Sequence, residues 1–272
     1  MTDHTLAVDH GLKWRAFWGL FLRDLRVLRR QLVAFLVRTI MNPLFFIFVF
    51  TYVFPKIGQG FQTTAGASFG TLILPGILAI GIFIQGIMAT ALPLSMEIGA
   101  TREIHDRVMS PLPVTWVAAQ KIVFSALQSV LAALVIFPLV YFIPVVPVQV
   151  HIYSWPMLIA VLLLASLVSG AVGLAIGTSV QPQHIALMFG IIVVPVTFLG
   201  CVYYPWAMMH TVRWLQILVL INPVVYMSEG LRTTLTPELP HMPAWVTLIA
   251  LAISLVVLSY FSMRGFVRRV LN

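Results

Sequence analysis

The stretch of sequence that decides the fold is residues 154–180, which read SWPMLIAVLLLASLVSGAVGLAIGTSV without a charged side chain. A helix of this length can cross the roughly 30 Å hydrocarbon core of a bilayer. Five further apolar stretches are predicted at 32–54, 71–96, 114–142, 185–202 and 242–263. Because a helix satisfies its own backbone hydrogen bonds in lipid, the sequence predicts an all-α integral membrane protein with six transmembrane helices.

The composition excludes a soluble globular domain. Hydrophobic residues make up 60% of the 272 residues, charged residues make up 9%, and the mean hydropathy is +1.01. A soluble chain of this length could not bury so much apolar surface in one core. We therefore divide the chain into a cytoplasmic tail with an amphipathic helix, residues 1–31, and a six-span membrane domain, residues 32–272.

The chain carries a net charge of +8. The positions of its basic residues predict how the chain is oriented in the membrane, and they argue against nucleic acid as its partner. Of the 16 Lys and Arg residues, seven lie in residues 1–38, three lie between residues 102 and 121, and three follow residue 263. Cytoplasmic flanks of membrane helices carry such an excess of cations and meet anionic lipid there. We expect a multi-pass protein of the cell membrane with both termini in the cytoplasm.

Residues 12–31 are predicted to form an amphipathic helix along the inner leaflet. Apolar residues recur at three- and four-residue steps from Trp14 to Leu28, which is typical of one helical face. The alternative is a basic segment that only sets the orientation of the first span. Such a segment would not need aromatic residues at regular helical steps. The arginines that fill much of the rest are Arg15, Arg23, Arg26, Arg29 and Arg30.

Residues 203–240 are predicted to form an outer re-entrant helical segment between spans five and six, because the segment is apolar but broken by prolines. Asn222 and Pro223 suit a helix start, and Glu229 and Arg232 lie three residues apart. An isolated charge at this depth is costly, so we expect these two residues to be paired. Two roles stay open for the four residues: an outer gate, or a cap that holds span six.

The sequence carries no recognisable energy source or catalytic centre. None of the eight acidic residues lies in the middle of a predicted span, which disfavours an ion-coupled carrier. A phosphate-binding loop needs Lys before Ser or Thr, but Lys13, Lys56 and Lys121 precede Trp, Ile and Ile. The histidine spacing and the single cysteine indicate no metal site. We predict no catalytic residue, metal or cofactor on this chain.

Residues 97–113 are the densest polar cluster after the amphipathic helix. Polar residues at three- and four-residue steps there would share one helical face and could dock a partner. The alternative is a solvated loop that only joins two spans. The residues predicted to contact a partner are Arg102, Glu103, His105, Asp106, Arg107, Ser110 and Pro111.

The order and spacing of these motifs resemble the permease class of type-2 ATP-binding-cassette exporters (ABC-2). The run Glu103, Arg107, Ser110-Pro111-Leu112 and Lys121 is similar to that family's cytoplasmic loop. Asn222-Pro223 followed by Glu229-Gly230-Leu231-Arg232 is similar to the segment before its last span. With the basic helix and six spans, the resemblance covers nearly the whole chain.

The resemblance implies a dimer of permease subunits, with two copies of a separate ATPase subunit that would hold ATP and Mg²⁺. Residues 102–111 would form the coupling helix, and residues 12–31 would form a connecting helix that also touches the ATPase. We expect a homodimer with spans one, two and five as candidate interface faces.

The resemblance also limits the substrate to the family's cargoes. We expect export of an amphipathic drug, lipid or glycolipid, and the alternative is a polysaccharide or lipid-linked glycan. Rivals from other classes are a membrane scaffold and a membrane-embedded enzyme. An enzyme should place clustered polar residues at one depth, and a scaffold would not need a charged loop for an ATPase.

Overall fold

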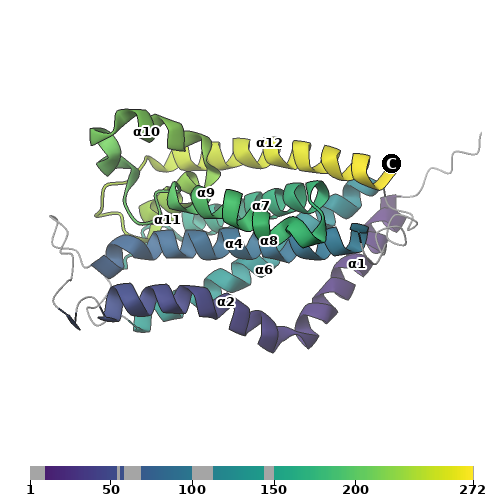
Figure 1. Cartoon of the computed structure of the whole chain (residues 1–272), viewed down its shortest axis with the longest axis horizontal. Coiled ribbons are helices and arrows are strands. Elements are labelled where there is room, and N and C mark those ends of the chain that lie inside the picture. The colour runs from purple at the N-terminus through teal and green to yellow at the C-terminus, as the bar shows by residue number, and fades with distance from the viewer. Residues whose placement is uncertain (1–9, 54–55, 58–68, 100–112, 144–149, 272) are drawn as a thin grey trace, which may run out of the picture.

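The structure is a computed structural model that describes residues 10–53, 56–57, 69–99, 113–143 and 150–271. These residues are largely helical and contain no β-strand. Most helices run side by side along the long axis of the molecule, and α1 (His10–Arg30) crosses one end obliquely (Figure 1). The all-α membrane architecture expected from the sequence is therefore confirmed.

Five helices in the described part of the chain are long and apolar enough to cross a membrane. They are α2 (Leu32–Ile47) with its π-helical continuation η1 (Phe48–Val53), α4 (Phe69–Gly99), α6 (Val114–Phe142), α7 (Trp155–Ser179) and α12 (Ala244–Leu271). The predicted bounds of spans one to four agree with these helices within a few residues. Span six continues to Leu271, two turns beyond its predicted end at residue 263.

The predicted fifth span, residues 185–202, is shorter than the other spans. The helical run covers residues 182–198 and consists of η2 (Pro182–His184), α8 (Ile185–Met188), η3 (Phe189–Val193) and α9 (Val194–Phe198). The predicted end at residue 202 is wrong, because the chain turns after Phe198 and Cys201 has a positive φ of 51°. The helix has already ended with Leu199 as its C-cap, and the left-handed Cys201 keeps the turn from continuing as a helix.

The predicted re-entrant segment consists of short helices. They are η4 (Trp206–Thr211), α10 (Arg213–Leu218), η5 (Val219–Ile221) and α11 (Pro223–Leu235). The run Arg213–Ile221 meets α11 at 99°. Asn222 stabilises the bend, because its side chain accepts a hydrogen bond from the backbone N–H of Val224 at 3.0 Å and donates one to the carbonyl of Val196 at 2.6 Å.

The core of the bundle lies between α4, α6, α7 and α11. Small residues let α4 and α7 approach closely: a Cβ atom at Gly173 would lie 2.9 Å from the Cα atom of Ile87. The apolar window of α4 is 78% buried, against 24% for the span formed by α2 and η1 and 17% for α12. Span two was predicted as an interface with a second copy, but its burial within one copy leaves little surface for that contact.

Candidate functional site

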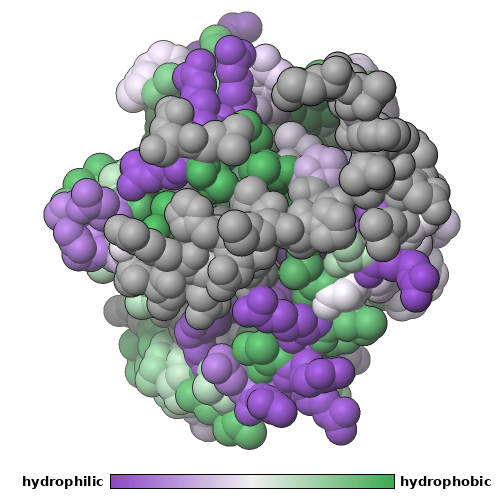
Figure 2. Space-filling model, turned by 90° about the vertical axis from the view of Figure 1, so that its right-hand side faces the viewer, coloured by the Kyte–Doolittle hydropathy of each residue, from purple (hydrophilic) through white to green (hydrophobic). Residues whose placement is uncertain are grey.

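The charged side chains of the described residues gather at the two ends of the bundle. Helix α1 and the C-terminus lie at one end, and α10 and α11 lie at the other (Figure 1). We call the first the basic end, because it carries the arginines of α1 together with Arg264, Arg268 and Arg269. Figure 2, which faces the basic end, shows hydrophilic residues at several places around it.

Helix α1 packs one aromatic face against α6 and exposes its arginines. Phe17 lies edge-on to Trp116 with ring centroids 6.2 Å apart, and Phe21 lies edge-on to Phe124 at 5.7 Å. The five predicted residues, Arg15, Arg23, Arg26, Arg29 and Arg30, are exposed. The amphipathic helix is therefore confirmed, and its contact with lipid or with an ATPase stays a prediction.

Two polar contacts at the basic end join helices that are distant in sequence. Asp24 of α1 is buried and accepts a hydrogen bond from Gln120 of α6 at 3.1 Å. Lys121 pairs with Glu97 at 2.7 Å, and both side chains are buried. Glu97, which the sequence predicts in the polar cluster of residues 97–113, lies in the last turn of α4. These contacts fasten α1 and α4 to the start of α6.

A chain of uncharged polar side chains continues from this end into the bundle. The hydroxyl of Thr39 on α2 donates to the Gln85 side chain on α4 at 3.2 Å, and the Gln85 amide donates to Gln128 on α6 at 3.4 Å. Such groups need partners inside a bundle that faces lipid. Sequence reasoning missed this chain, although glutamines within apolar helices were a usable signal.

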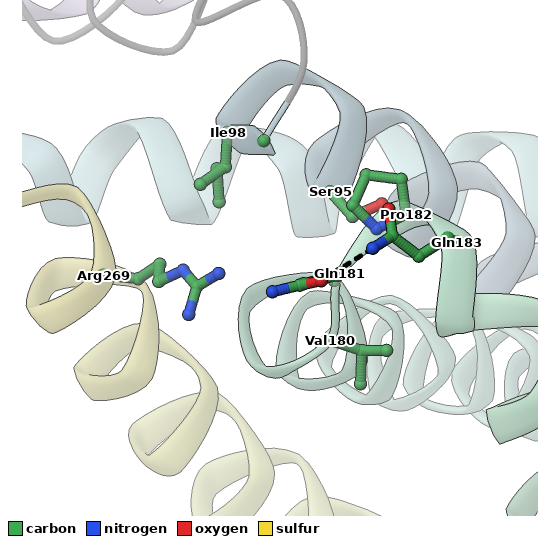
Figure 3. Close-up of a pocket in the computed structure, with 9 residues that line it drawn as sticks. Ser95, Ile98, Val180, Gln181, Pro182, Gln183 and Arg269 are labelled. Atoms are coloured by element: carbon green, nitrogen blue, oxygen red, sulfur yellow. Dashed lines mark hydrogen bonds between the residues drawn. The ribbon is translucent and has the colours of Figure 1, made fainter.

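The predicted coupling residues, Arg102, Glu103, His105, Asp106, Arg107, Ser110 and Pro111, all lie outside the described residues. A cavity of about 460 Å³ adjoins the last described residue before them, Gly99. Figure 3 shows the Arg269 side chain pointing from α12 toward Gln181. The described residues that line this cavity include Arg269 and no carboxylate, so this part of its wall suits a negatively charged group.

The opposite end holds a fully buried ion pair in α11. Glu229 pairs with Arg232, as the sequence predicts, and neither side chain is exposed to solvent. The Glu229 carboxylate also accepts hydrogen bonds from the backbone N–H groups of Trp206 at 2.8 Å and Met242 at 2.9 Å. The guanidinium of Arg232 donates to the carbonyl oxygen of Cys201 at 3.2 Å. One pair therefore fastens α11 to three other segments at this end of the bundle.

This network bears on the two roles that the sequence left open for Asn222, Pro223, Glu229 and Arg232. An outer gate would have to break several buried, charge-assisted contacts each time it opened, whereas a cap would keep them. The arrangement supports the cap, and the gate role stays a prediction. Among the described residues, no cluster of three His, Cys, Asp or Glu side chains could hold a metal ion.

We expect Glu229→Gln to lower the stability of the protein by about 3–5 kcal/mol, because it leaves the buried Arg232 without a counter-charge. Thermal melting of the purified protein in detergent measures this loss. Glu238→Gln is the matched control, because Glu238 is exposed and should change the melting temperature little.

The charge swap Glu229→Arg with Arg232→Glu should not restore stability. An arginine at position 229 cannot accept the N–H groups of Trp206 and Met242. Recovery of the melting temperature in the swapped variant would contradict the network, because it would mean that only the charge pair matters.

Comparison with known proteins identifies the family. Residues 15–236 match the family model described as ABC-2 type transporter. The match takes in α1 from residue 15 onward, the spans up to residue 198 and the whole of α11. A comparison with curated proteins found no match.

Proposed function

We propose that this chain, which belongs to the ABC-2 type transporter family, is the permease of an exporter that moves an amphipathic substrate outward. Membership makes the chain the membrane subunit of an ABC transporter and a multi-pass membrane protein. The family match over residues 15–236 is the observation that carries the proposal. Outward transport is our inference from the resemblance to ABC-2 exporters, and the positive-inside rule assigns the basic end to the cytoplasm of a cell membrane.

The energy would come from a partner ATPase at the basic end. Proteins of this family pair with an ATP-binding-cassette ATPase, and we propose two copies, which would hold ATP and Mg²⁺. The proposed contacts are residues 102–111, the arginines of α1 and the cavity beside Arg269. Two observations support this placement. The cavity adjoins Gly99, three residues before the proposed coupling segment, and Arg269 can pair with an acidic side chain of the partner.

The working unit would be a homodimer with the transport path between its copies. Large apolar side chains are exposed on α2 and on residues 182–198, among them Phe45 at 61% and Ile191 at 61%. Tyr203 joins the two surfaces, because its ring lies 6.2 Å from Phe46 and 5.7 Å from Phe198. A continuous apolar surface of this kind suits a second copy, and span two takes little part in it.

We expect Glu103→Ala and Arg107→Ala each to reduce substrate-stimulated ATP turnover in the reconstituted complex, while folding and insertion stay intact. Loss of one partner of a buried interfacial charge pair costs about 2–5 kcal/mol. The control is Glu238→Ala, an exposed acid in the linker between α11 and α12. Normal stimulation in both loop variants would remove this segment from the coupling role.

We expect a cysteine at Ile191 to form disulfide-linked dimers under mild oxidation in the membrane. A cysteine at Ile253 of α12 is the matched control, because Ile253 is 59% exposed but lies on a helix outside the proposed interface. The native Cys201 is buried and should add no background. Gel electrophoresis without reducing agent reads out the result, and cross-linking at residue 253 but not at residue 191 would contradict the proposed interface.

A further inference from the structure

A second cavity at the basic end, of about 470 Å³, lies between α1, α2, α4 and α6. Helices α1 and α2 meet at an elbow that stands apart from α4 (Figure 1). The cavity lies beneath this elbow, and its lining includes Arg38 of α2, Leu92 of α4 and Phe124 and Gln128 of α6. Its size falls in the usual range of small-ligand sites.

Arg38 is the residue in this cavity whose charge points to an anionic ligand. It is the seventh residue of the first span, so it lies roughly 9 Å inside the start of the helix. The side chain is exposed, and no hydrogen bond or ion pair joins it to the other described residues. An arginine this close to the end of a span can extend toward the headgroups of the interface, where anions and water are its partners.

The acidic side chains that line the same cavity are engaged elsewhere. Asp24 accepts its hydrogen bond from Gln120, and Glu97 pairs with Lys121 at 2.7 Å. Both carboxylates are buried. The charge of Arg38 is therefore left to a group that comes from outside this part of the chain.

The lining of the cavity offers both polar and apolar side chains to an amphiphile. Gln128 and the buried Lys121 are among its polar residues, and Phe35, Leu92 and Phe124 are among its apolar residues. Val37 and Met41, next to Arg38 on α2, are 53% and 45% exposed and would face lipid tails. The volume suits a headgroup, and the tails would stay along α2 in the bilayer.

We propose that this cavity binds the phosphate-bearing headgroup of an anionic amphiphile from the inner leaflet, with Arg38 as the phosphate ligand. The planar guanidinium can give two parallel hydrogen bonds to phosphate oxygens. The inference rests on the proposed function and deepens it, because it makes the cavity a loading site and names the substrate class as anionic amphiphiles.

The test uses the full chain purified with its ATPase partner in phosphatidylcholine nanodiscs. A photoactivatable phosphatidylglycerol is titrated in, and the cross-linked peptides are identified by mass spectrometry. We expect saturable labelling of peptides from α2 and α6. Arg38→Gln should weaken the apparent affinity about tenfold, and Arg38→Lys should lose less, since it keeps the charge but not the paired donors. Arg264→Gln, which changes an exposed cation of α12 outside the cavity, should bind like the wild type.

Three results would overturn the site: unchanged binding in Arg38→Gln, equal labelling by a photoactivatable phosphatidylcholine, or labelling that never saturates. Glycerol phosphate, added as a soluble competitor, distinguishes a membrane lipid from a soluble anion as the source of the phosphate. Failure to compete supports a membrane amphiphile, and full competition at a similar concentration would replace it with a soluble anion.

Transport measured with the same purified complex, reconstituted in sealed phosphatidylcholine vesicles, separates this inference from the proposed function. ATP-driven export without saturable, Arg38-dependent binding would overturn the site and leave the function standing. Saturable, Arg38-dependent binding without ATP-driven export would support the site and contradict the function.

Discussion

Charged and polar side chains inside a bundle that faces lipid must find partners within the protein, because hydrocarbon offers them none. The two ends of this molecule meet that constraint differently. At the α11 end, the Glu229 carboxylate has three donors, and Arg232 reaches the backbone of Cys201. At the basic end, the buried pair of Glu97 and Lys121 lies beside a cavity that also exposes Arg38. At the α11 end, the charged side chains pair with each other and with backbone groups. At the basic end, Arg38 has no partner among the described residues and is available to a ligand.

This asymmetry fits a permease driven from one side. Helix α4 is held by α6, α7 and the turn after α9, where a Cβ atom at Gly76 would lie 1.9 Å from the carbonyl oxygen of Val202. The first span is only 24% buried and can move with less loss of packing. An ATPase at the basic end would act on α1 and on the ends of α4 and α6. Movement of α2 relative to α6 would then open or close the cavity that holds Arg38.

The sequence predicted the features that depend on local patterns. Apolar runs located the long helices, and the spacing of Glu229 and Arg232 predicted their pairing. It could not locate contacts between distant residues, such as Asp24 with Gln120 or the chain of Thr39, Gln85 and Gln128. The early end of the fifth span depends on the turn at Cys201, and the central place of α4 depends on packing with three other helices. Neither can be read from hydropathy alone. The polar chain was not predicted, although glutamines within apolar helices were a usable signal for it.

The most direct test of this account measures where the molecule moves when ATP binds to the complex. Spin labels at Val37 of α2 and Val123 of α6, both exposed, report on the cavity at the basic end. Labels at Trp214 of α10 and Trp245 of α12 report on the α11 end. The account predicts that ATP changes the distance distribution of the first pair and leaves that of the second pair unchanged. A shift confined to the second pair would contradict it, because the α11 end would then be the moving part.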